Sequence, residues 1–494
     1  MPIPRVADAG ALIRLHESLL FQRAFPSSPG AIRQADRQLF SFARRIDRLR
    51  DTHVDLSPFE DPAVSGIAGT SLSAVFSYEV ARQLFARYPR NLAIDWENYE
   101  RQDKLGPVLR RLLPLVEEDW PVEAHVPFRD WIGAAKGQAS ELGWLLDGIA
   151  ALPLDARGRS DLYDSLDLLL VWQIENAPAS RSLLRLPLPK PYCHRKPLLR
   201  RADVSIEREL AGPPLRLTRL SRPEAQKILG IILDSSAMRY RELYGFTHPD
   251  AARVIRADAG RGVQIFFFGV PPEWRLPLRA YHAGMFFKNG VPIGYVEVLS
   301  LFERAEVGFN LYYTFREGET AWVYARLLRL FRQVLGVTCF SVDPYQIGLE
   351  NDEALDSGAF WFYRKLGFRP LDPAVAQLVG REERKMLRKP GYRSSRHTLE
   401  KLARSYILLE SSACVPGVWD RFRVRNLALA VERARIADEP NPLRQLLRLA
   451  KDREPALDHL EAIVAAKQGP DEVRYLHLLQ RHARLRAAVL QLGS

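Results

Sequence analysis

The side chains best suited to chemistry fall between residues 290 and 370 of this 494-residue chain. Glu297, Glu303 and Glu306 lie in or beside two apolar segments that we expect to be strands. A carboxyl group in such a segment is costly unless it faces a cleft or has a partner, so it is a candidate general base. We favour Glu306, then Glu297; an exposed acid at a strand end is the alternative, above all for Glu303. His282 is a further candidate base, with a structural role as its alternative.

A turn and a short aromatic segment follow in the same region. The run Arg316-Glu317-Gly318-Glu319-Thr320-Ala321 comes after a strand and begins an amphipathic helix. Backbone N–H groups at such a helix start can converge on phosphate oxygens, aided by the positive end of the helix dipole. Two acids there, Glu317 and Glu319, would repel phosphate unless both side chains turn outward; the alternative is that they are ordinary first-turn acids. The aromatic segment, residues 359–368, reads AFWFYRKLGF.

A small mixed sheet with one helical crossover would bring these residues together. Asn289-Gly290, the strongest hairpin signal in the chain, joins two expected strands, and a third follows at 305–315. A helix is predicted over 316–336, and its apolar residues share one face. The continuous apolar run after it, 337–345, is typical of a buried strand that pairs in parallel after a crossover.

Both flanks of this region are predicted to be helical. Amphipathic periodicity extends over residues 1 to about 200 and again from about 396 to the end. A Pro-rich, basic stretch near residue 195 interrupts it and predicts a linker. The expected fold class is therefore α+β. It has an all-helical domain at 1–200, a mixed α/β sheet domain at 201–392 and a C-terminal helical bundle or cap at 393–494.

The central region, about residues 212–375, resembles the GNAT superfamily of N-acetyltransferases. The hairpin, the Arg-led turn, the crossover helix and the FYRKLGF segment occur in that family's order. The family's acetyl-CoA pyrophosphate loop has the pattern Q/R-x-x-G-x-G/A. Arg316 and Ala321 fit it, whereas Glu319 occupies the position of the central glycine and Gly318 is displaced by one. The resemblance implies a GNAT-like domain whose cofactor site includes Asn310, Leu311, Tyr312, Tyr313, Arg316, Gly318, Thr320, Ala321 and Asp356, the last in place of a family Asn.

By the same resemblance, Tyr363 would protonate the thiolate of coenzyme A as it leaves. A phenol, with an ordinary pKa near 10, suits a weak acid that faces a thiolate. The alternative is that Tyr363 only packs its helix against the sheet. The implied reaction is acetyl transfer from acetyl-CoA to an amine by direct attack on the thioester, without a metal, while the helical domains choose or cover the acceptor.

Two other functions stay open at this point. One is a GNAT-fold binding or scaffold protein that has lost catalysis, which the substitution at Glu319 favours. The other is a transferase that acts on RNA or aminoacyl-tRNA, encouraged by the net charge of +12. Because basic residues alternate with acids instead of forming one stripe, we expect a small molecule or a protein as the amine acceptor rather than nucleic acid.

The cysteine content and the apolar segments indicate the role of the cysteines and the expected cellular location. Cys193, Cys339 and Cys414 are too few and too far apart in sequence to predict a disulfide framework or a zinc site. The N-terminus lacks a secretory pattern, and no apolar run approaches the roughly 20 residues of a membrane span. We therefore expect a cytoplasmic protein without membrane attachment.

Overall fold

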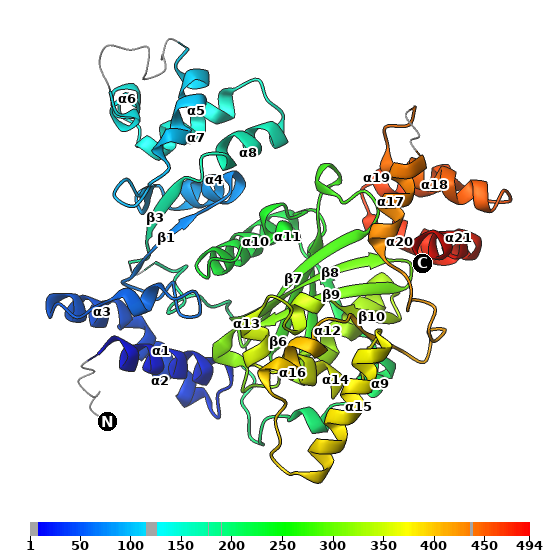
Figure 1. Ribbon diagram of the computed structural model, residues 1–494. Coiled ribbons are helices and arrows are strands. Elements are labelled where there is room, and N and C mark those ends of the chain that lie inside the picture. Colours follow the sequence, from blue (N-terminus) through cyan, green and yellow to red (C-terminus); the bar gives the residue numbers. More distant parts are fainter. Residues whose placement is uncertain (1–7, 115–125, 176, 189, 435–437) are drawn as a thin grey trace. The chain divides into compact units, whose positions relative to one another are not determined.

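The chain divides into two compact units. The computed structural model describes residues 8–114, 126–175, 177–188, 190–434 and 438–494 (Figure 1). Unit 1 comprises residues 1–193 and 226–248, and unit 2 comprises residues 194–225 and 249–494. This division differs from the predicted one, because residues 226–248 belong with the N-terminal part and residues 393–494 belong with the central sheet.

Unit 1 is not all-helical, which corrects the prediction for residues 1–200. It holds a three-stranded antiparallel sheet in the order β1-β3-β2, formed by β1 (Ser71–Val75), β2 (Leu92–Ile94) and β3 (Leu169–Gln173). Two segments that we expected to be helical contain β1 and β3. Burial alternates along both strands, and β3 reads LLVWQ. Over such short apolar runs a helical period cannot be told from strand alternation.

The helices between residues 78 and 164, together with part of the helix at 222–237, share one apolar core with this sheet. Trp172 of β3 and Tyr163 are among its completely buried residues, and Leu233 joins them from the second stretch of the unit. The part of the predicted helical region at residues 115–125 lies outside the described residues. The helices are α1 (Ala9–Ala24), α2 (Pro29–Phe40), α3 (Phe42–Asp51), α4 (Tyr78–Arg87), α5 (Leu105–Leu112), α6 (Phe128–Ala135), α7 (Glu141–Ala151), α8 (Ala156–Asp164), most of α10 (Arg222–Ala237) and α11 (Tyr244–Thr247).

Unit 2 is built on a nine-stranded mixed sheet in the order β11-β12-β10-β9-β8-β7-β6-β5-β4. Neighbours from β4 to β9 are antiparallel, as expected for the meander, and β10 is parallel to β9, as expected after the crossover. Asn289 and Gly290 have φ of 49° and 80°, the positive values that a two-residue hairpin requires. The strands are β4 (Arg216–Arg219), β5 (Ile255–Gly260), β6 (Val263–Gly269), β7 (Ala280–Lys288), β8 (Val291–Leu301), β9 (Arg304–Leu311), β10 (Cys339–Val342), β11 (Arg369–Pro370) and β12 (Ile407–Glu410).

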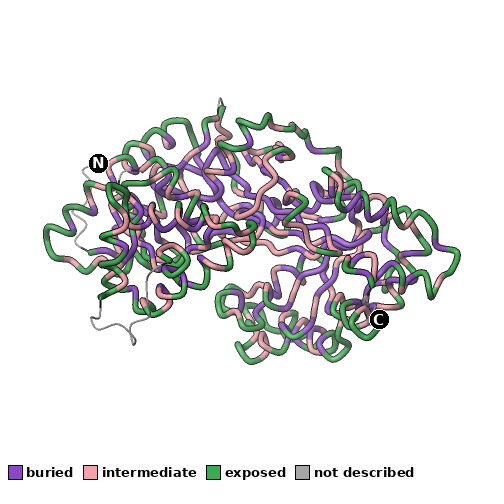
Figure 2. The backbone as a smooth tube through the Cα atoms, turned by 90° about the horizontal axis from the view of Figure 1, so that it is seen from above, coloured by how far each residue is buried: buried purple, intermediate pink, exposed green. Residues whose placement is uncertain are grey.

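The crossover helix α12 (Thr320–Leu335) covers one face of this sheet. The ring of Tyr324 lies 5.0 Å from that of Phe309 on β9, and Phe331 lies 5.5 Å from Phe267 on β6. The helix ends at Gly336, whose φ of 70° is a left-handed cap. β7 is buried at all its positions, in line with the buried strands of the interior (Figure 2).

The C-terminal residues are part of this sheet unit and not a separate bundle. β12 pairs with both β10 and β11, so only the first part of the helix predicted there is helical. The last helices share a core with Leu301, Phe302 and Cys339, because their apolar faces bury against that part of the sheet. The remaining helices of unit 2 are α9 (Ile206–Ala211), α13 (Asp352–Asp356), α14 (Ala359–Arg364), α15 (Pro373–Arg388), α16 (Arg396–Leu402), α17 (Val424–Ala434), α18 (Pro442–Arg453), α19 (Leu460–Gln468), α20 (Glu472–Arg481) and α21 (Ala483–Gly493). No helix of the described residues is both long and apolar enough to cross a membrane.

Candidate functional site

Strand β9 runs past its neighbour β10, and this opens the sheet. β10 pairs with residues 304–306 only, whereas β9 continues to Leu311. The Tyr312 N–H donates to a carbonyl of β8 at 2.9 Å. Backbone hydrogen-bonding groups alternate in direction along a strand, so those of every second residue before Tyr312 also point to β8. The N–H and C=O groups of Phe309 and the N–H of Leu311 therefore point to the side where β10 has ended, whereas the Leu311 carbonyl accepts a hydrogen bond from Arg316 Nε at 3.4 Å. This edge can pair with an extended polar ligand.

A cavity of about 250 Å³ lies at this opening. Gln346 lines it on the face away from α12, while Phe309 and Tyr363 contact Tyr324 of α12 on the other. The opening thus reaches both faces of the sheet. The structure brings together in this one cavity the predicted site residues Asn310, Leu311, Arg316, Thr320 and Tyr363.

The other predicted cofactor residues do not line the cavity. Asp356 is exposed and accepts a hydrogen bond from Arg396 at 3.1 Å; Asn351, which caps α13, lines the cavity instead. The side chain of Tyr313 is exposed, and the amide of Tyr312 is already bonded to β8. Gly318 and Ala321 lie in the adjoining turn and first helical turn.

The turn before α12 carries a buried carboxylate. Glu319 is the N-cap residue of α12 and is 1% exposed. Arg261 donates to it from Nε at 3.0 Å and also from Nη2, Leu199 donates its backbone N–H at 3.2 Å, and Lys288 Nζ lies 3.5 Å away. Glu317 is exposed, as one interpretation required. For Glu319 both interpretations are wrong, because its side chain turns inward to a group of cations.

These cations give the turn before α12 a net positive charge. Burial opposes ionisation of Glu319, but hydrogen bonds from Arg261 and the charge of Lys288 outweigh it and lower the pKa of the carboxyl group. Burial lowers the pKa of Lys288 to about 8, and burial together with the Lys288 charge lowers the pKa of His194 to about 4. At neutral pH, Glu319 offsets Arg261, Lys288 is mostly protonated and His194 is neutral. About one positive charge therefore remains beside the first turn of α12, which suits an anionic ligand.

Tyr363 packs in the core and also lines the cavity, so its position agrees with either interpretation of its role. Its ring packs against Tyr324 and Phe368, each with centroids 5.5 Å away, and the residue also lines the cavity. Burial raises the pKa of the Tyr363 phenol, which therefore stays protonated at neutral pH, as a proton donor must. The hydroxyl of Tyr324 beside it is buried and has no hydrogen-bond partner among the described residues.

Glu297 lies next to the opening. It is the register partner of Gly308 on β9, and the Tyr281 hydroxyl donates to its carboxylate. Burial raises the pKa of Glu297, and the hydrogen bond from Tyr281 only partly offsets this. A Cβ atom on Gly308 would lie 3.6 Å from Nε2 of Gln346, a residue of the cavity wall. Gly308, which has no side chain, thus lies between Glu297 on β8 and the wall of the cavity.

Glu306, our first choice from sequence, faces a different cavity. It lines a hollow of about 380 Å³ and accepts a hydrogen bond from Arg279 at 3.3 Å. Glu303 accepts hydrogen bonds from Trp419 Nε1 at 2.9 Å and pairs with Arg486 at 2.6 Å, which is a structural role. The geometry therefore favours Glu297 over Glu306 as a base at the opening.

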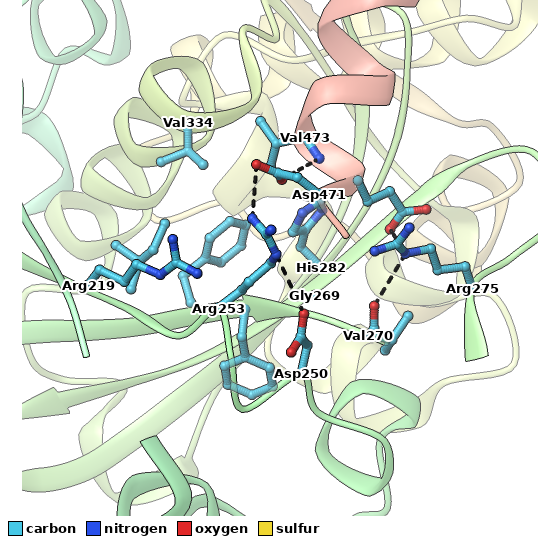
Figure 3. Close-up of a pocket in the computed structure, with 14 residues that line it drawn as sticks. Arg219, Asp250, Arg253, Gly269, Val270, Arg275, His282, Val334, Asp471 and Val473 are labelled. Atoms are coloured by element: carbon cyan, nitrogen blue, oxygen red, sulfur yellow. Dashed lines mark hydrogen bonds and ion pairs between the residues drawn. The ribbon is translucent and has the colours of Figure 1, made fainter. Parts of the chain in front are cut away.

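His282 lies on the face of the sheet opposite to Glu297. It stacks on Phe267 with centroids 5.3 Å apart and lines a separate cavity of about 210 Å³ (Figure 3). Arg253 spans this cavity and pairs with Asp471 at 3.0 Å. Burial lowers the pKa of His282 to about 3, so it is neutral, and it is not among the residues that meet at the β9 opening.

Two cysteines that are distant in sequence meet in the core. Cys339 on β10 and Cys414 are both buried and belong to one apolar core. Both are free thiols. The sequence did not predict this proximity, because separation along the chain does not measure distance in the fold.

No protein-family model, curated protein or solved structure matches the chain. The site therefore rests on the geometry of the described residues. The partners of Glu319 were not predicted from the sequence; they are Arg261, Lys288 and His194. For Lys288 a signal existed, because a lysine that ends an apolar strand needs a partner when it is buried. Arg261 and His194 carried no comparable signal.

Proposed function

We propose that unit 2 is an acyl-CoA-dependent N-acyltransferase of the GNAT type, which transfers an acetyl group to an amine. The observation that carries this proposal is the cavity at the end of β10, where β9 continues without a partner. Residues selected from the sequence because of the family resemblance line this one cavity, although they come from a strand, a turn and a separate helix.

The proposed cofactor runs along the open edge of β9. Its amide-containing arm would hydrogen bond to the backbone of Phe309 and Leu311. Its phosphates would lie at the first turn of α12, near Arg316 and Thr320, where the residual positive charge offsets theirs. Because Glu319 is turned inward and neutralised, its carboxylate does not oppose phosphate binding there.

The proposed chemistry needs one base and one acid. The amine nitrogen attacks the carbonyl carbon of the thioester, and Glu297 accepts the amine proton directly or through a water molecule. The tetrahedral intermediate collapses, the C–S bond breaks, and Tyr363 donates its proton to the departing thiolate sulfur. The products are an amide and coenzyme A, and the two proton transfers leave Glu297 protonated and Tyr363 deprotonated until solvent restores both.

A second candidate is a GNAT-fold protein that binds the cofactor without catalysis. It is favoured by the turn before α12, where Glu319 replaces the expected glycine and is held by Arg261 and Leu199. Such fixation limits how the turn can adjust to phosphates. The two candidates make different predictions about turnover but the same prediction about binding.

Isothermal titration of the full chain with acetyl-CoA, and separately with coenzyme A, tests the proposal. We expect dissociation constants below a millimolar for both ligands. An absence of binding heat in that range, supported by an unchanged melting temperature, would contradict both candidates. Binding without release of free thiol in the presence of a broad amine panel would favour the non-catalytic candidate.

A further inference from the structure

The cavity beside Glu306 is strongly basic. Its volume is about 380 Å³, and its lining includes Arg279, Arg304, Arg404, Arg423 and Arg425. The two acids that line it are already engaged. Glu306 pairs with Arg279 at 3.3 Å, and Asp372 accepts the N–H groups of Ala374 and Val375 as the N-cap of α15. We call this hollow the arginine cavity; its lining carries an excess of three positive charges.

Arg304 shows that the cavity is a built site and not a group of surface arginines. Arg304 is 8% exposed, its Nε donates to the Ser341 hydroxyl at 3.1 Å, and its guanidinium lies 5.9 Å from the ring centroids of both Trp419 and Phe422. Within the described part of the chain, no carboxylate lies within ion-pair distance of Arg304. Glu306, two residues along β9, attracts the Arg304 charge from beyond that distance. A buried guanidinium without a direct ion-pair partner is costly, so an anionic ligand would supply a contact that the protein does not.

Three further arginines of the cavity also lack an acidic partner among the described residues. Arg423 donates to the backbone carbonyls of Asp420 at 3.0 Å and Phe422 at 2.8 Å, which fixes its guanidinium at the wall. Arg404 and Arg425 are exposed. A guanidinium presents paired N–H donors that match the two oxygens of a carboxylate or a phosphate.

The arginine cavity and the opening at β9 lie along the same strand. Glu306 lines the first and Asn310 lines the second, and both side chains point to the same face because they are four residues apart. Gly308 lies midway, with Glu297 opposite it. Since two residues of a strand span roughly 7 Å, each cavity lies within reach of a small molecule that is centred on Gly308.

We propose that the arginine cavity binds an anionic group of the acceptor, so that the acceptor is an amine that also carries a carboxylate or a phosphate. The anion is held by Arg304, Arg404 and Arg425, and the amine lies over Gly308, beside Glu297 and the end of the cofactor arm. The acceptor role rests on the proposed function, whereas the anion site does not.

Three probes with the same two-carbon amine test the anion site: O-phosphoethanolamine, β-alanine and ethanolamine. Each is titrated calorimetrically at constant ionic strength into the full chain and into Arg404→Gln/Arg425→Gln. The matched control is Arg384→Gln/Arg388→Gln, which removes two exposed charges from α15 outside the cavity. We expect at least one anionic probe to bind the wild type and the control at least tenfold more tightly than ethanolamine. The cavity variant should lose most of that preference, and the two anionic arms distinguish phosphate from carboxylate.

Equal binding of all three probes, or an unchanged preference in the cavity variant, would overturn the inference. Acetyl-CoA is titrated into the same proteins, and we expect its affinity to be equal in all of them. If acetyl-CoA fails to bind while the anionic preference is present, the proposed function and the acceptor role fail, and the anion site stands. If acetyl-CoA binds and the preference is absent, only this inference fails.

Discussion

Glu297 on β8 and Gly308 on β9 are register partners at the point where β9 has just lost its neighbour β10. One partner is a half-buried carboxyl group with a raised pKa, and the other has no side chain. The pair thus combines a candidate proton acceptor with a position that has no side chain and faces Gln346 of the cavity wall. Its position between the two hollows makes it the first target for mutation.

Gly308→Ala should leave the fold intact and impair the reaction. A Cβ atom at Gly308 meets its nearest neighbour, Gln346, at 3.6 Å, which is an ordinary contact. We expect the free energy of unfolding to change by less than about 0.5 kcal/mol, while the Michaelis constant for the acceptor or acetyl-CoA rises. Gly294→Ala is the contrasting variant, because its Cβ would overlap the Asn310 carbonyl oxygen and lie 2.6 Å from Phe286. It should lose about 2 kcal/mol of stability in a urea titration; equal stability of the two variants would contradict this description of the opening.

Glu297→Gln should lower turnover about a hundredfold or more if Glu297 is the base. Because the pKa of Glu297 is raised, the wild-type rate should fall with decreasing pH at a higher pH than an ordinary glutamate would dictate. The pH dependence of kcat/KM, measured by release of free thiol, gives this limb. Glu306→Gln is the control, since it removes the partner of Arg279 but should leave the limb in place. If the acidic limb of kcat/KM shifts in Glu306→Gln and not in Glu297→Gln, Glu306 is the base and Glu297 is not.

Tyr363→Phe should reduce kcat by about a hundredfold while it leaves the acetyl-CoA dissociation constant nearly unchanged. The substitution keeps the ring that packs on Tyr324 and Phe368 and removes only the hydroxyl. Tyr324→Phe removes a neighbouring buried hydroxyl that has no partner among the described residues, so stability should be unchanged or increase by about 1 kcal/mol. Paired rate and denaturation measurements separate the two tyrosines; a full rate in Tyr363→Phe would remove it from the mechanism.

Glu319→Gln should destabilise unit 2 by about 3 kcal/mol, because it leaves Arg261 and Lys288 without their shared carboxylate. In the double variant Glu319→Gln/Lys288→Met one of the uncompensated charges is also gone. Its loss of stability should therefore be smaller than the sum of the two single losses by about 1 kcal/mol or more. Glu317→Gln, at an exposed position of the same turn, should have little effect. Additive losses in chemical denaturation would show that Glu319 and Lys288 do not interact.

The buried neutral His282 should make the fold sensitive to acid. Burial lowers its pKa to about 3, against 6.5 in the unfolded chain. Between these values the unfolded state binds more protons than the folded state, so the free energy of unfolding decreases as the pH falls. Between pH 6.5 and pH 4 this one group accounts for about 3 kcal/mol.

His282→Phe keeps a ring stacked on Phe267 and removes the titration. The loss of stability between pH 6.5 and pH 4 should therefore be clearly smaller in this variant than in the wild type. His397→Gln, at an exposed position, is the control and should follow the wild type. Denaturant titrations at several pH values provide the comparison, and identical slopes for His282→Phe and wild type would rule out this source of acid sensitivity.

Local patterns in the sequence determined the centre of unit 2. The Asn289-Gly290 turn, the apolar face of α12 and the apolar run of β10 each depend on residues close together in the chain, and such patterns are visible without tertiary contacts. The family resemblance rests on the same local order of elements, and it was this resemblance that selected Arg316, Thr320 and Tyr363. Short strands such as β1 and β3 were not predicted, because a run of a few residues has no distinct hydrophobic period.

Which distant residues meet depends on how the chain packs. Pairings between remote segments place β12 beside β10 and bring Glu319 to Arg261 and Lys288. They are also the reason that Glu297, rather than Glu306, is the preferred candidate base. The arginine cavity likewise combines side chains from residues 279 to 425. The sequence determined the elements and their chemical groups, whereas the charge balance and the partners of those groups followed from burial, because burial is a property of the packed chain.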